Sequence, residues 1–195
     1  MSTKLLVALT FQEGHSFTKK IQQFRSRFDE KYQSHKELHL GLVPPFEISD
    51  HVLKDLIETL IEELETFFFD MKDPKQLIFQ DIKVHDFKKK KLLYLEPTED
   101  ADLEHLEDLM RTICKDYFSG QQPDPHLAKS FLTIGRFRDD LELQNAYELS
   151  RVEFREDVTL PCRSISLFKK HGDLWLEDKI LISFPRLEDH FYNPA

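Results

Sequence analysis

The chain begins with two segments in which the apolar residues are arranged differently. The run KLLVALTF, residues 4–11, is short and rich in leucine and valine, which predicts a buried strand. In residues 14–32 the apolar side chains recur at helical spacing, which predicts an amphipathic helix with basic residues on its other face. These apolar positions are Phe17, Ile21, Phe24 and Phe28.

The helical period returns in three later segments. It is clearest in residues 50–68, where eight apolar positions follow it over several turns. A second helix is expected to begin at Thr98 or Asp100, since either side chain can cap it. A third and more polar helix is predicted for residues 139–149. The first two have enough apolar residues to pack against a core.

Strict alternation predicts a half-buried strand in ELHLGL, residues 37–42. Its leucines share one face, whereas His39 and Gly41 share the other. Pro44 and Pro45 are expected to end this strand, because proline cannot donate a backbone hydrogen bond.

Further strands are predicted at residues 76–87, 91–97 and 130–137, and two or more follow that turn at His171–Gly172. The four lysines at 88–91 separate the first two of these strands. A solvated hairpin tip explains such a run better than a contact with nucleic acid does.

Composition narrows the class of protein. The 195 residues, 40% of them apolar, suffice for one domain with a real core, and a count of only five Gly argues against a flexible linker. A net charge of -9 argues against a general nucleic-acid binder, so an anionic ligand needs local positive groups. No segment approaches the ~20 apolar residues of a membrane span, and no secretory signal precedes the first strand, so a cytoplasmic protein is expected. Cys114 and Cys162 are expected to be reduced, and their thiols are expected to have a structural and not a reactive role.

Two tetrapeptides in predicted strands point to chemistry. His39-Leu40-Gly41-Leu42 precedes Pro45-Phe46, and Phe131-Leu132-Thr133-Ile134 precedes Gly135-Arg136. Each is half of a His-x-Thr-x motif, because the first has glycine for threonine and the second has phenylalanine for histidine. With the order of elements over nearly the whole chain, these motifs resemble the two-histidine phosphoesterase superfamily, which includes the 2′-5′ RNA ligase-like proteins.

The resemblance implies an α+β, bilobal fold in which two antiparallel sheets face a central groove and helices lie outside. It implies one domain, residues 1–195, with two lobes of approximately 1–98 and 99–195. Family members act without metal or other cofactor on phosphodiesters at nucleotide ends. A small phosphodiester, a nucleotide or an RNA end is therefore the expected partner, and a monomer is favoured.

Imidazole can remove or deliver a proton near neutrality, whereas phenylalanine can do neither. The expected catalytic groups are His39 and Thr133, and Phe131 at the second histidine position predicts weak activity. Gly41 lacks the hydroxyl that would hold a phosphate oxygen, although its backbone can approach a ligand closely. His126, in PDPHLAKSF, either replaces the missing histidine or is a solvated loop residue.

Arg136, just after the second motif, is the cationic residue expected to contact a bound phosphate. Plain alternation puts Arg136 on the face of Leu132 and Ile134, away from Thr133. The side chain of Arg136 can then contact a phosphate only if a bulge changes its face. Without a bulge, it is expected to form an ion pair at the surface or between strands. HKELH, residues 35–39, differs from the zinc-binding H-E-x-x-H pattern in the place of its glutamate, so no metal site is expected there.

Three functions remain open at this point. The first is a degenerate phosphoesterase whose groove still accepts a nucleotide or another phosphodiester. The second is a non-catalytic binding module with an apolar groove, which predicts aromatic walls and no basic side chain within reach. The third is a fully active enzyme that uses His126 or a carboxylate in place of the missing histidine.

Overall fold

The computed structural model describes residues 2–69, 73–87, 90–119 and 130–186. These residues form four α-helices, α1 (Ser16–Phe28), α2 (Leu53–Phe67), α3 (Ala101–Lys115) and α4 (Asp140–Glu153). The seven strands are β1 (Ser2–Phe11), β2 (His39–Ser49), β3 (Gln76–Phe87), β4 (Lys90–Pro97), β5 (Leu132–Phe137), β6 (Val158–His171) and β7 (Leu174–Ser183). Among the described helices, none has the length and apolar character needed to cross a membrane.

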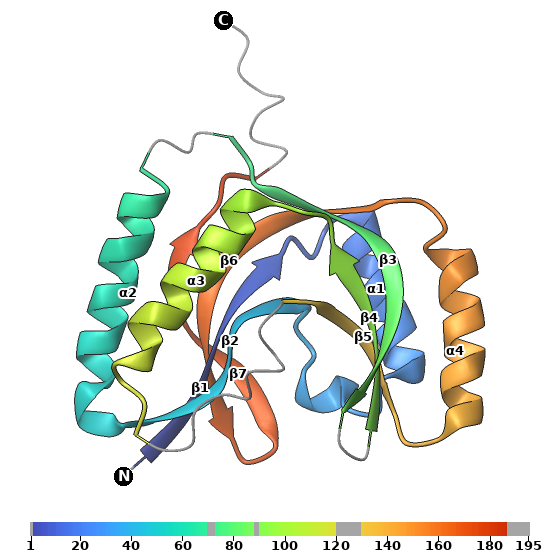
Figure 1. Cartoon of the computed structure of the whole chain (residues 1–195), viewed down its shortest axis with the longest axis horizontal. Helices are drawn as coiled ribbons and strands as arrows, with labels where there is room; N and C mark the ends of the chain where they lie inside the picture. The colour runs from blue at the N-terminus through green and yellow to red at the C-terminus, as the bar shows by residue number, and fades with distance from the viewer. Residues whose placement is uncertain (1, 70–72, 88–89, 120–129, 187–195) are drawn as a thin grey trace, which may run out of the picture.

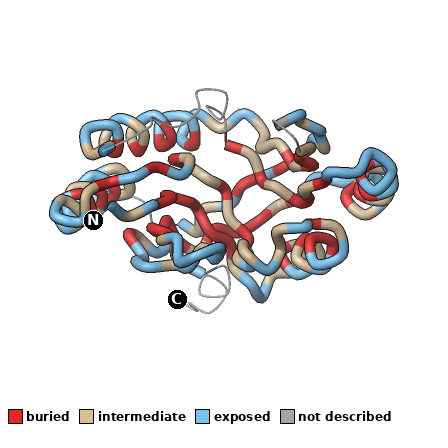
Figure 2. Tube along the Cα trace, turned by 90° about the horizontal axis from the view of Figure 1, so that it is seen from below, coloured by how far each residue is buried: buried red, intermediate tan, exposed pale blue. Residues whose placement is uncertain are grey.

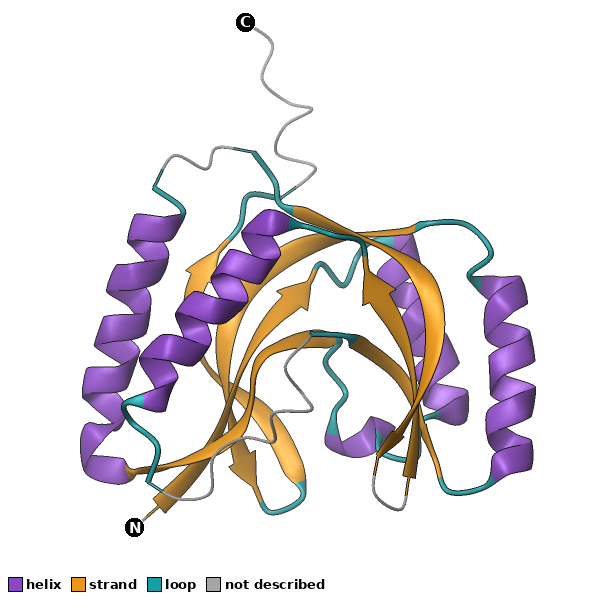
Figure 3. Ribbon diagram, viewed as in Figure 1, coloured by secondary structure: helices purple, strands orange, loops and turns teal. Residues whose placement is uncertain are grey.

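The strands pair antiparallel in the order β2-β1-β6-β3-β4-β5, with β7 also on β6. Residues 158–161 of β6 pair with β3, whereas residues 162–169 pair with β1, so two sheets share this one strand. Both sheets therefore contain strands from residues 1–98 and from residues 99–195. Figure 3 shows the strands inside and the helices outside, which confirms the expected α+β architecture.

The helices cover the two sheets in pairs. Helices α2 and α3 pack against β7 and β2, whereas α1 and α4 pack against β5 and its neighbours (Figure 1). Figure 2 shows that the buried residues lie along the strands and on the helix faces that turn toward them. Ile21 and Phe24 of α1 are completely buried, as the helical period predicts. The two cysteines are buried as well, and burial raises the pKa of each thiol to about 12.

Strand β2 corrects one prediction. It continues through Pro44 and Pro45 to Ser49, so the expectation that the prolines end it is wrong. In the pairing with β1, Val43 lies opposite Val7 and Phe46 opposite Leu5, which leaves both prolines at an irregularity opposite Leu6. Because β2 is also an edge strand, the missing N–H groups cost little there.

Candidate functional site

The edge strands β2 and β5 approach one another across a cavity. Ser130, just before β5, donates a hydrogen bond from its hydroxyl to the carbonyl of Gly41 on β2, at 2.7 Å. The cavity beside this contact has a volume of about 370 Å³. Its lining comes from β1, α1, β2, β4, β5 and the segments beside them: Leu6, Arg25, Lys31, His35, His39, Gly41, Pro44, Pro45, Lys90, Leu92, Ser130, Phe131, Thr133 and Arg136.

His39 begins β2 and faces the cavity, as alternation with the buried Leu40 predicts. Its Nδ1 lies 2.9 Å from the carbonyl oxygen of Glu37. A carbonyl oxygen only accepts, so Nδ1 carries the proton and Nε2 keeps its lone pair. Burial, with a smaller contribution from the charges of Arg25 and Arg136, lowers the pKa of His39 to about 4, while the Glu37 carbonyl opposes the shift. The ring is therefore a neutral base at pH 7.

A second imidazole, His35, lines the same cavity. Its ring centroid lies 6.0 Å from that of His39 and 6.2 Å from that of Trp175, against which it stacks. Burial lowers the pKa of His35 to about 3, with Arg136, His39 and Arg25 adding to the effect. His35 was not predicted as a site residue, because the only pattern it belongs to in the sequence is the zinc-like HKELH.

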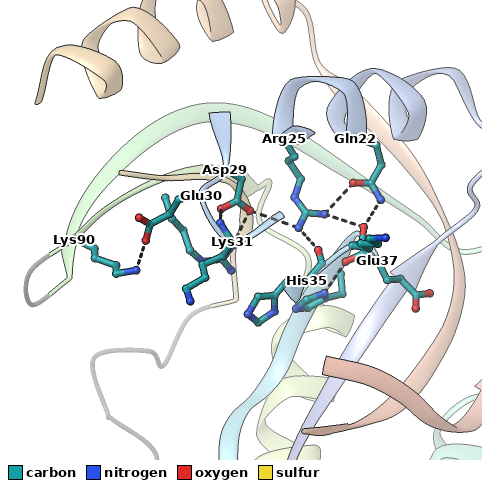
Figure 4. Close-up of polar contacts among 11 residues, drawn as sticks. Gln22, Arg25, Asp29, Glu30, Lys31, His35, Glu37 and Lys90 are labelled. Carbon is teal, nitrogen blue, oxygen red and sulfur yellow. Dashed lines mark hydrogen bonds and ion pairs between the residues drawn. The ribbon is translucent and has the colours of Figure 1, made fainter. Parts of the chain in front are cut away.

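Two arginines of the cavity lining, Arg25 and Arg136, share one buried carboxylate, that of Asp29. Figure 4 shows Arg25 and Asp29 with the contacts around them. Asp29 follows α1, its side chain has no exposed surface, and its Oδ2 accepts a hydrogen bond from Arg136 at 2.7 Å. The same Oδ2 lies 3.6 Å from Arg25, which is only 2% exposed. Arg25 also donates to the backbone carbonyls of His35 and Lys36. The guanidinium of Arg25 therefore fixes the segment that carries His35, although the helical pattern placed the basic residues of α1 on its outer face.

Two lysines add positive charge to this wall. The backbone N–H of Lys31 donates to Asp29 Oδ1 at 3.1 Å, and no ion pair within the described residues involves its ammonium group. Lys90 forms an ion pair with Glu30, which Arg138 also contacts at 3.2 Å. Of the predicted hairpin tip, Lys88 and Lys89 lie outside the described residues. The prediction is incomplete for Lys90, because this side chain lines the cavity.

Strand β5 brings Thr133 and Arg136 to the same cavity by means of a bulge. Gly135 pairs with Leu93 and Thr133 with Tyr94, so Ile134 is the extra residue between two consecutive partners on β4. The bulge that phosphate contact requires is present, and the ion pair with Asp29 is present as well. Plain alternation therefore gave the wrong face for Arg136.

The remaining predicted residues fall into two groups. Phe131 lines the cavity and packs on Tyr94, with ring centroids 4.7 Å apart. Gly41 lines it as well, and a Cβ added there would meet only Leu6 Cδ1, at an ordinary 3.6 Å. His126 lies outside the described residues.

Behind His39 lies a second polar cluster, away from the cavity. Arg163 pairs with both Glu37 and Glu177 and donates from Nε to Thr10 at 3.1 Å. Burial raises the pKa of Glu37 to about 7, with Glu177 adding to the shift and Arg163 opposing it. This cluster supports the residue whose carbonyl orients His39.

The fold has counterparts among solved structures of low sequence identity. It superposes on a protein described as a phosphoesterase with a TM-score of 0.53 and 13% identity, covering 91% of this chain and 94% of that one. A conserved protein of unknown function from Agrobacterium tumefaciens gives a TM-score of 0.50 and 14% identity, covering 93% and 86%. No curated protein matches the sequence significantly. The class defined by these likenesses is a phosphoesterase fold.

The sequence itself gives the family. Residues 14–174, well over half of the chain, match the model of the 2′-5′ RNA ligase superfamily. The chain belongs to this superfamily, which agrees with the resemblance drawn from its two half-motifs.

Proposed function

We propose that this protein binds a nucleotide or RNA end through its phosphate and hydrolyses phosphodiesters weakly at most. The observation that supports this most is the composition of one cavity. It contains His39 from the first motif, Thr133 from the second, and four basic side chains in a chain whose net charge is -9. A local positive field of this kind is what an anionic ligand needs in an acidic protein.

His39 is the group best suited to act as general base in this proposal. Its Nε2 lone pair can take the proton of a water molecule that attacks phosphorus, while the Glu37 carbonyl holds the ring in place. A pKa of about 4 keeps His39 unprotonated at pH 7 but makes it a poor proton acceptor. Slow hydrolysis is the result expected from this base alone.

Within the described part of the chain, no histidine is in place to protonate the leaving oxygen as the second motif histidine would. Phe131 occupies the second histidine position of the motif and cannot protonate it. A general acid contributes roughly 10²- to 10⁴-fold in rate, so its loss supports binding with little turnover. His35 is neutral near pH 7, since its pKa is about 3, and is better suited to donating a hydrogen bond to a phosphate oxygen than to delivering a proton.

The apolar-groove alternative receives less support from the lining. It predicted no basic side chain within reach, whereas Arg25, Lys31, Lys90 and Arg136 all line the cavity. Phe131 and the two prolines instead supply an apolar wall on which a nucleobase could stack beside the bound phosphate.

The test is cleavage of a 2′,3′-cyclic nucleotide by the native protein, by Phe131→His and by Phe131→His combined with Gly41→Thr. The space beside Gly41 admits a Cβ without collision, and Phe131→His alone keeps the test valid if the larger threonine side chain disturbs the fold. We expect native turnover near background and a gain of at least ~10²-fold in the variants, because a proton donor is restored.

His39→Ala in the double-variant background is the control for this experiment. It should remove the gained activity, since it removes the proposed base while keeping the new histidine. Native turnover as fast as that of the double variant would contradict the proposal of weak catalysis. Absence of nucleotide binding by the native protein would contradict the proposal as a whole.

A further inference from the structure

The charge of the cavity wall exceeds what its own carboxylates neutralise. Four basic side chains line the cavity, and the two carboxylates paired with them are Asp29 and Glu30. Both histidines of the cavity have pKa values of about 4 or lower, chiefly because of burial, and are neutral at pH 7. Two positive charges are therefore left over on one wall.

Part of this charge is free to meet a ligand. Arg136 directs one terminal nitrogen to Asp29, and no hydrogen bond from the described part of the chain occupies its other nitrogens. Its side chain remains 18% exposed, in contrast to the buried carboxylate it pairs with. Lys31 adds an ammonium group that forms no ion pair within the described residues. These two side chains can contact an anion directly.

Arg25 acts on the same anion through its field. Its guanidinium is 2% exposed and its terminal nitrogens are held by Asp29 and by backbone carbonyls, so it cannot move toward a ligand. Its Nε is buried without a hydrogen-bond partner in the described structure. A fixed, desolvated positive charge of this kind favours anions more strongly than an exposed one does.

We propose that the wall formed by Arg25, Lys31 and Arg136 selects a terminal phosphate monoester, which carries two negative charges, over a phosphodiester, which carries one. This inference rests on the proposed function and names the end group that the nucleotide or RNA presents. The uncompensated charge of the wall matches the dianion, and the guanidinium of Arg136 has a second terminal nitrogen and its Nε with which to bind phosphate oxygens at two points. The ligand is thus an RNA or nucleotide end that already bears a phosphate.

The test uses two ligands that differ by one charge. The affinity of the full-length protein for 2′-deoxyadenosine 3′-monophosphate and for its methyl ester is measured by calorimetry at pH 8 and pH 5. Neither ligand has a 2′-hydroxyl, so internal attack on phosphorus cannot occur. We expect the monoester to bind at least ~10-fold more tightly at pH 8, and the preference to shrink at pH 5, because the second pKa of a phosphate monoester is ~6.

Two arginines close in sequence give the matched variants. Arg136→Gln should reduce the preference for the monoester to within about 2-fold, because it removes the exposed guanidinium of the wall. Arg138→Gln removes the same charge from a side chain that is 72% exposed and outside the cavity lining, and should leave the preference unchanged. Lys31→Gln, which removes no ion pair, should weaken the preference even if Arg136→Gln proves unstable.

The outcomes separate this inference from the proposed function. Equal or tighter binding of the methyl ester would overturn the inference and leave nucleotide binding intact. An equal loss of preference in Arg136→Gln and Arg138→Gln would also overturn it, because a general field would then explain the result. No binding of either ligand would overturn both.

Discussion

Asp29→Asn tests whether the buried carboxylate holds the cationic wall together. The side chain of Asp29 has no exposed surface. It forms ion pairs with Arg136 and Arg25 and accepts a hydrogen bond from the backbone N–H of Lys31. Asparagine keeps the shape and one acceptor oxygen but leaves two guanidinium groups without a counter-charge, and one of them is 2% exposed. Removal of one partner from a buried ion pair costs about 3–5 kcal/mol. In a chain of this length that loss corresponds to a fall in Tm of about 6–20 °C.

Urea denaturation followed by circular dichroism measures the free energy of unfolding of Asp29→Asn. Glu30→Gln is the matched control, because Glu30 is the next residue and also pairs with two basic side chains but is 30% exposed. Its removal should cost about 1 kcal/mol or less. Adding Arg136→Gln to Asp29→Asn should recover part of the loss, since one unpaired charge disappears. A loss below about 1 kcal/mol in Asp29→Asn would refute the reasoning.

Two further predictions concern the bulge and the pH dependence of stability. Gly135→Ala should lower the free energy of unfolding by about 1–3 kcal/mol, because its Cβ would lie 2.6 Å from two ring carbons of the buried Phe137. Thermal denaturation checks this against Gly14→Ala, whose Cβ would meet nothing within 4 Å. Equal Tm values for the two variants would contradict the prediction. The pKa of His39, lowered from 6.5 to about 4 mainly by burial, means that the unfolded chain binds more protons between these pH values. Its contribution to stability is therefore complete above pH 6.5 and lost as the pH falls toward 4, by up to about 3 kcal/mol. His39→Gln should reduce the fall in urea midpoint between pH 7 and 4.5 and leave the part that comes from His35, whose pKa burial lowers to about 3. The exposed His51→Gln should leave the fall unchanged.

Local sequence patterns were sufficient for the face of β2 but not for that of β5. The alternation of leucine with His39 and Gly41 predicts the cavity-facing residues of β2, because those positions lie beyond the irregularity at the prolines. In β5 the same rule failed for Arg136, since a bulge at Ile134 shifts the pairing with β4 by one residue. A bulge depends on the partner strand, and a single segment of sequence does not reveal it.

The cationic wall was even less accessible to sequence reasoning. Arg25 lies within an amphipathic helix, where a basic residue is normally assigned to the outer face, yet it is buried against Asp29. His35 and Lys90 come from a short 3₁₀ turn region and a hairpin, more than fifty residues apart in sequence. Only the packing of α1 against β5 and the approach of β2 and β5 bring these side chains to one cavity. The roles assigned to His39, Thr133 and the residues around them remain predictions for the experiments above.

The sharing of β6 between the two sheets has a mechanical consequence. No residue of β6 is among those that line the cavity, yet the two sheets join along this strand between Pro161 and Cys162, so the angle between them affects the separation of β2 from β5. With strands spaced about 4.8 Å apart, β2 lies about 10 Å and β5 about 14 Å from β6, so a rotation of about 5° moves either edge by about 1 Å. A displacement of about that size can change a catalytic rate by about 10²-fold. Substitutions along β6 would therefore change the distance between His39 and Thr133 even at positions other than Phe168, whose ring centroid lies 5.4 Å from that of His39.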